Sequence, residues 1–197
     1  MEFQNRDFIQ SVKRTREKFG APMILLHARI DRGTSAQRAR DSALFALCYL
    51  VVWAAFSALA AAAQAALIDS GAVASANLAL GDRVFSAALL LVAAAWQLTP
   101  AKAACLDQCQ SPIQFVLRYW RPGAGGAVRL GLIHGLFCLG CCWGLMLLLF
   151  VGGVMNLAWV ALLAAVVLAE KIAPPAWRIG RWLAAALAAG AGVVLLA

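Results

Sequence analysis

The stretch HGLFCLGCCWGL, residues 134–145, places one histidine and three cysteines inside a run of apolar residues. Imidazole and thiolate groups favour copper(I) or zinc over magnesium or calcium. At about 100° per residue on a helix, all four side chains fall within an arc of about 100°. We therefore expect one helix face to present a metal-binding group, made of His134, Cys138, Cys141 and Cys142.

A second pair of cysteines, Cys105 and Cys109, is four positions apart, the spacing at which helical side chains converge. We expect this pair to complete the metal site, to receive metal from a carrier, or to exchange disulfides with the first group. The alternative is that the cysteines only pack, because an uncharged thiol is a small and mostly apolar side chain. For Cys48, packing is the favoured interpretation.

The composition around these residues is that of a membrane protein. Of the 197 residues, 63% are hydrophobic and 13% are charged, and the mean hydropathy is +0.80. Soluble domains contain roughly 45–50% apolar and about 25% charged residues. The alanine-rich and leucine-rich runs favour helices over barrel strands, which alternate polar and apolar residues.

The predicted fold class is therefore all-α, a polytopic transmembrane bundle with about five spans. The spans are expected at residues 42–68, 84–98, 130–151, 154–169 and 178–197. The second and fourth apolar runs are short and need flanking residues to cross a hydrocarbon core about 30 Å thick.

Positive charges predict the orientation, because lysine and arginine near spans tend to stay in the cytoplasm. With alternating sides, all but one of the 17 lysines and arginines fall on the cytoplasmic side, and the exception is Arg83. The N-terminus is then inside and the C-terminus outside. This bias also explains the net charge of +8 without a nucleic-acid partner.

We accordingly divide the chain into a basic cytoplasmic segment, 1–41, and a transmembrane domain, 42–197, with a cytoplasmic loop at 99–129. Residues 1–20 lack the apolar core and cleavage site of a signal peptide, so we expect the first span to act as the insertion signal.

Local signals predict how the loop and the later spans are arranged. Thr99 and Pro100 are typical of a helix start, and Ser111 with Gln114 resembles a capping box. The segment PGAGG, 122–126, should break the chain before the third span. Only the glycines at 152 and 153 separate the third and fourth spans, which predicts a tight antiparallel hairpin.

In that hairpin, Glu170 would lie opposite His134 and could orient the imidazole or bind metal directly. The alternative is a solvated charge pair with Lys171 at a helix end. Glycines at 131 and 135 and at 140 and 144 give the third span two small-residue faces. We expect this helix to be central and in close contact on two sides.

Several motifs resemble a bacterial family described as predicted metal-binding integral membrane proteins, a domain of unknown function. The similarity runs over about residues 21–183. The matching positions are Thr99, Pro100, Lys102, Cys105, Leu106 and Cys109, then His134, Gly135, Cys138, Cys141, Cys142 and Trp143, and the segments 150–159 and 168–171. Members usually carry a methionine-rich helix upstream. Here only APM, residues 21–23, remains of it.

The residues and the resemblance together imply a multi-pass protein of the bacterial inner membrane that binds copper(I) or zinc for trafficking, delivery or sensing. Its partners would be the lipid bilayer and a metal carrier or other membrane subunits. A non-enzymatic role is favoured. The alternatives are a membrane thiol-disulfide oxidoreductase, using Cys138 and Cys141, and a structural or assembly subunit of a membrane complex.

Overall fold

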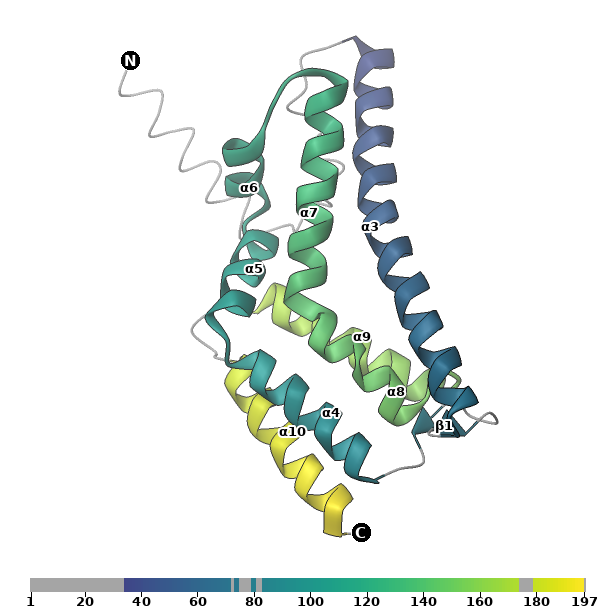
Figure 1. Ribbon diagram of the computed structural model, residues 1–197. Coiled ribbons are helices and arrows are strands. Elements are labelled where there is room, and N and C mark those ends of the chain that lie inside the picture. The colour runs from purple at the N-terminus through teal and green to yellow at the C-terminus, as the bar shows by residue number, and fades with distance from the viewer. Residues whose placement is uncertain (1–33, 72, 75–78, 81–82, 174–178, 197) are drawn as a thin grey trace.

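The computed structural model describes residues 34–71, 73–74, 79–80, 83–173 and 179–196 (Figure 1). Most of the basic segment 1–41, the APM residues and the ends of the predicted last span therefore lie outside the described residues. Within them the chain is helical apart from one short antiparallel pair, β1 (Val73–Ala74) with β2 (Ala79–Leu80). This confirms the expected all-α class.

The helices follow the apolar runs of the sequence. In chain order they are α3 (Ser35–Asp69), α4 (Arg83–Gln97), α5 (Pro100–Gln110), α6 (Pro112–Tyr119), α7 (Gly123–Met146), α8 (Leu148–Gly152), α9 (Leu157–Ile172) and α10 (Ile179–Leu196). Helix α3 lies along α7, α5 packs against α7 on another side, and α10 lies along α4 (Figure 1).

Three of the described helical segments are long and apolar enough to cross a membrane: α3, the continuous stretch 123–152, and α10. Helices α4 and α5 would add a fourth if they form one broken span, since they bend by 66° at the break between them. Helix α9, with 16 residues, is not among these candidates. A span needs about 20 residues. The count of five and the orientation remain predictions.

The local signals were correct in most places. Thr99 caps α5 by accepting from the Lys102 backbone N–H, and Pro100 occupies the first turn. Ser111 does precede α6, but the capping-box prediction is wrong, because its side chain makes no capping hydrogen bond. The break before α7 ends at Pro122, so most of PGAGG lies inside the helix.

The connection between α7 and α9 is longer than the predicted turn of two glycines. Helix α7 ends at Met146, and the short α8 follows it. The chain then turns at Gly153, which has a φ of 79° that glycine adopts readily, and α9 starts after the cap Asn156. The chain does return toward α7, as expected, but Lys171 reaches Cys138 rather than His134.

Helix α7 is in close contact on two sides, as predicted. A Cβ atom added at Gly131 would lie 2.4 Å from the Phe45 carbonyl oxygen of α3. One added at Gly144 would lie 2.8 Å from Cδ1 of Trp96 in α4, and one at Gly140 would lie 2.8 Å from the Cys105 sulfur in α5. The glycines therefore allow the helix-to-helix distances that bring α3 and α5 to α7.

This packing predicts the effect of adding one methyl group. Gly131→Ala should lower the free energy of unfolding by about 1–3 kcal/mol, because the backbone of α3 must move away. Chemical unfolding of the detergent-solubilised chain measures the change. Gly125→Ala is the matched control in the same helix, since a Cβ there meets nothing within 4 Å. Equal stability of the two variants would show that the α3–α7 contact is not tight.

Candidate functional site

Three thiols of α7 are buried together. Cys138, Cys141 and Cys142 are each 2% exposed. The thiols of Cys141 and Cys142 both donate to the Cys138 backbone oxygen, at 3.0 Å each. These bonds keep the two later thiols folded back on their own helix. The three cysteines of α7 therefore lie together in one buried group, as the spacing predicted.

Helix α5 brings a further thiol to this face. The Cys109 and Cys141 sulfurs are 3.8 Å apart, although 32 positions separate the residues in sequence. The Cys105 sulfur of α5 lies over Gly140 of α7. Both α5 cysteines thus face α7, since the glycine leaves room for a close approach. The structure therefore brings one cysteine of the α5 pair, Cys109, into contact with Cys141, while a shared metal site remains a prediction.

Cys138 has two polar partners that the sequence analysis did not identify. The Lys171 ammonium of α9 donates to its sulfur at 3.1 Å, and the Tyr49 hydroxyl of α3 lies 3.3 Å from it. An ammonium beside a sulfur stabilises negative charge on that sulfur. No motif pointed to Tyr49, because its position depends on how α3 crosses α7.

His134 lies among aromatic rings. Its ring centroid is 6.0 Å from that of Phe45, 5.7 Å from that of Tyr49 and 5.1 Å from that of Phe115. Its Nδ1 atom is buried and has no hydrogen-bond partner among the described residues. The structure records no hydrogen bond from His134 to a cysteine of α7 or to Glu170. The histidine adjoins the thiols through Tyr49, which stacks on its ring and contacts the Cys138 sulfur, and its role as a ligand remains a prediction.

Glu170 pairs with Lys102 of α5. The Lys102 ammonium donates to the carboxylate at 2.6 Å, and both side chains are 3% exposed. It also donates to the Gln97 side-chain oxygen. The expected pairing of Glu170 with His134 is therefore not what the structure shows. The alternative of a solvated charge is also wrong, because the carboxylate is buried.

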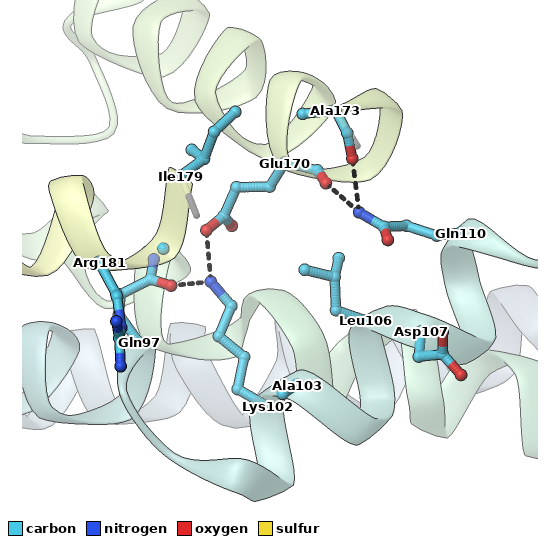
Figure 2. A pocket seen from close by; sticks show the side chains of 11 residues that line it. Gln97, Lys102, Ala103, Leu106, Asp107, Gln110, Glu170, Ala173, Ile179 and Arg181 are labelled. Atoms are coloured by element: carbon cyan, nitrogen blue, oxygen red, sulfur yellow. Dashed lines mark hydrogen bonds and ion pairs between the residues drawn. The ribbon is translucent and has the colours of Figure 1, made fainter. Parts of the chain in front are cut away.

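The same region contains a cavity of about 340 Å³ between α5, the end of α9 and the start of α10 (Figure 2). Gln110 of α5 closes one side, donating through its amide to the backbone oxygens of Glu170 at 2.7 Å and of Ala173 at 3.1 Å. This cavity was not anticipated, since its lining residues come from four helices, α4, α5, α9 and α10.

Nothing in the described part of the chain is arranged as a finished metal site. No group of three or more His, Cys, Asp or Glu side chains there could hold an ion as it stands. All six cysteines are free thiols. The protein hydrogen bonds described above occupy the thiols instead, so metal binding would require some of them to break.

The fold and the site together define an all-helical protein with apolar helices and a buried group of thiols. Comparison with known proteins is more specific: residues 19–194 match the family described as PpoB2, copper chaperone. The chain belongs to this family. The match supports the metal-related family and the copper association expected from the motifs. No curated protein and no solved structure matches the chain.

The buried ion pair predicts a strong dependence of stability on Lys102. Lys102→Met should lower the free energy of unfolding by about 3–5 kcal/mol, because it leaves the Glu170 carboxylate buried and unpaired. The double variant Lys102→Met, Glu170→Leu should recover most of this loss, since it removes both charges. Chemical unfolding in detergent gives both values. A single variant no less stable than the double one would contradict the buried pairing.

Proposed function

We propose that the chain is an integral membrane copper chaperone that carries Cu(I) on thiolates contributed by α5 and α7. Copper is its cargo rather than a resident cofactor. The observation that carries this proposal is the 3.8 Å separation of the Cys109 and Cys141 sulfurs on two different helices.

The distance suits two ligands of one ion. With a metal–thiolate bond of about 2.3 Å, as measured for zinc, two sulfurs on one ion are about 3.8 Å apart at a tetrahedral angle and about 4.0 Å apart at a trigonal angle. The sulfur of Cys138 is the third candidate, since it neighbours both Cys109 and Cys141. An all-sulfur set favours Cu(I), because soft ligands select this ion.

Lys171 supplies the charge balance that a buried thiolate needs. Its ammonium contacts the Cys138 sulfur. Two thiols that bind one Cu(I) ion release their two protons, and the resulting complex has one net negative charge. The Lys171 ammonium, kept beside the sulfurs, would balance this charge in the apolar interior. The rearrangement that turns the hydrogen-bonded thiols into a ligand set is then the loss of their bonds to the Cys138 backbone oxygen.

The other predicted ligands take secondary roles in this proposal. Cys105, next to Cys109 on α5, would receive copper from a carrier, and Cys142 would serve as a reserve sulfur beside Cys138. His134 and Glu170 would become ligands only if they left their aromatic and Lys102 contacts. For the same reason zinc, which often takes nitrogen and carboxylate ligands, is the less favoured cargo.

Titration of the purified full chain with Cu(I), in competition with a chromophoric Cu(I) chelator, tests the proposal. The wild type should bind one equivalent. Cys109→Ser and Cys141→Ser should each weaken binding by about a hundredfold or more, since loss of an outer-shell partner alone costs about 10–100-fold. Cys48→Ser is the matched control, because Cys48 packs against Gly131 of α7, away from the Cys109–Cys141 contact.

Unchanged affinity in Cys109→Ser and Cys141→Ser would contradict the copper site.

The alternative function is thiol-disulfide exchange, which the Cys109–Cys141 contact and the cation beside Cys138 also favour. The same two variants address this alternative. Thiol trapping in cells would then show a Cys109–Cys141 disulfide that forms and disappears. Thiols that stay reduced would favour the chaperone over the oxidoreductase.

The membrane location rests on the outward-facing apolar residues. Leu59 of α3 is 72% exposed and Leu196 of α10 is 91% exposed, and apolar side chains line much of both helices. Exposing such apolar surfaces to water is unfavourable, whereas contact with lipid chains is not. We propose that the transmembrane domain, 42–197, lies in a bacterial inner membrane with the basic segment 1–41 and the loop 99–129 in the cytoplasm.

Carbonate extraction and a reporter fusion test this placement. The chain should stay in the membrane pellet at alkaline pH, because spanning helices resist extraction. A reporter that is active only outside the cytoplasm should be active at the C-terminus and inactive at the N-terminus. Release into the soluble fraction would contradict insertion, and activity at the N-terminus would contradict the orientation.

A further inference from the structure

No cysteine lines the cavity of about 340 Å³, although five of its lining residues belong to α5 (Figure 2). Ile179, Gly180 and Arg181 line it, and they form the first turn of α10, an 18-residue helix. The first N–H groups of a helix have no acceptor within the helix, and the helix dipole adds partial positive charge there. This wall therefore favours negatively charged groups.

Gln97 in the cavity wall has an unused donor. The residue is 7% exposed, and its side-chain oxygen accepts from Lys102. Its Nε2 group has no hydrogen-bond partner in the described part of the chain. A buried donor without an acceptor is costly, so the cavity lacks an acceptor at this point.

The Lys102 ammonium likewise has an unused hydrogen-bond donor. Its ammonium has three protons, and the structure records two acceptors for it, Glu170 and Gln97. Lys102 neutralises the Glu170 carboxylate. The other carboxylate in the lining, Asp107, is exposed and points away from this pair (Figure 2). Arg181, also exposed, adds a second cation at the rim.

Gly180 faces oxygen atoms of the same polar group. A Cβ atom added there would lie 3.4 Å from the Gln97 backbone oxygen and 3.8 Å from Oε1 of Glu170. It would therefore point at the polar group that Gln97, Lys102 and Glu170 form. A larger side chain at this position would fill the space in front of this group.

We propose that this cavity binds a phosphate-type oxyanion, held by the first turn of α10, the Gln97 amide, the third proton of Lys102, and Arg181. The phosphate could be free or belong to a lipid headgroup. Trp182 directly follows Arg181 in α10 and is 75% exposed, and exposed tryptophans are typical of a bilayer interface. The site does not depend on the proposed copper binding.

Two probes distinguish the sources. Inorganic phosphate is titrated calorimetrically into the full chain in neutral detergent, and phosphatidylglycerol is added in native mass spectrometry, with phosphatidylcholine as the reference lipid. Phosphate binding indicates a free-anion site. Retention of phosphatidylglycerol over phosphatidylcholine, without phosphate binding, indicates a headgroup site. Either result supports the proposal if the variants below weaken it, and binding of neither probe overturns it.

The variants use matched controls. Arg181→Gln should weaken binding about tenfold, because it removes a charge-assisted hydrogen bond. Gly180→Val should abolish it by filling the cavity. Arg83→Gln, an exposed arginine in the first turn of α4, and Gly190→Val, where a Cβ on α10 meets nothing within 4 Å, should leave it unchanged. Helix content by circular dichroism and a single elution peak show that each variant folds.

Binding that Arg181→Gln and Gly180→Val leave at the wild-type level would overturn the proposal. So would an equal loss in the control variants, since that would reflect general charge or stability rather than this cavity.

Discussion

The close approach of α7 to its neighbours is the constraint on which the rest of the structure depends. Glycine removes the side chain where α3 and α5 cross α7, so backbone and sulfur atoms fill that space. At Gly140 this has a direct chemical result. The Cys105 sulfur rests on the glycine, and one turn further along α5 the Cys109 sulfur meets Cys141. The thiol group therefore depends on the close packing of α5 against α7.

The end of α9 links two polar sites through adjacent residues. Glu170 faces Lys102 and the cavity, while Lys171 contacts the Cys138 sulfur on α7. Since the two side chains leave the helix about 100° apart, one short segment can serve both sites. Each buried charge has an opposite or polarisable partner, as an apolar interior requires. Movement of this segment would affect the thiols and the cavity together.

Helical periodicity and capping chemistry made much of the fold predictable. The 3.6-residue repeat placed the cysteines on one face of α7, and Thr99 with Pro100 gave the start of α5. The partners across helices were not predictable in the same way. Assigning Glu170 to His134 assumed a turn of only two glycines, but α8 ends at Gly152 and α9 starts only after Asn156. The longer turn shifts the register and leaves Lys171 beside Cys138.

His134 shows why spacing alone does not define a ligand set. Its position on α7 is compatible with the cysteine face, yet Phe45, Tyr49 and Phe115 from other helices enclose its ring. The position of these rings depends on tertiary packing, which has no local sequence signal. Lys102, which pairs with Glu170, was among the positions that match the family motifs, but only the bend between α4 and α5 brings it to α9.

The division of the thiols between two helices bears on how a chaperone could release its cargo. Ligands on a single helix keep a fixed spacing, whereas the Cys109–Cys141 distance depends on how α5 lies against α7. Helix α5 has 11 residues and is bent 66° from α4, so it can move without disturbing a long continuous helix. A small shift of α5 would separate the two sulfurs. In the proposed transfer Lys171 would stay beside Cys138, so the sulfurs would keep a counter-charge as copper leaves.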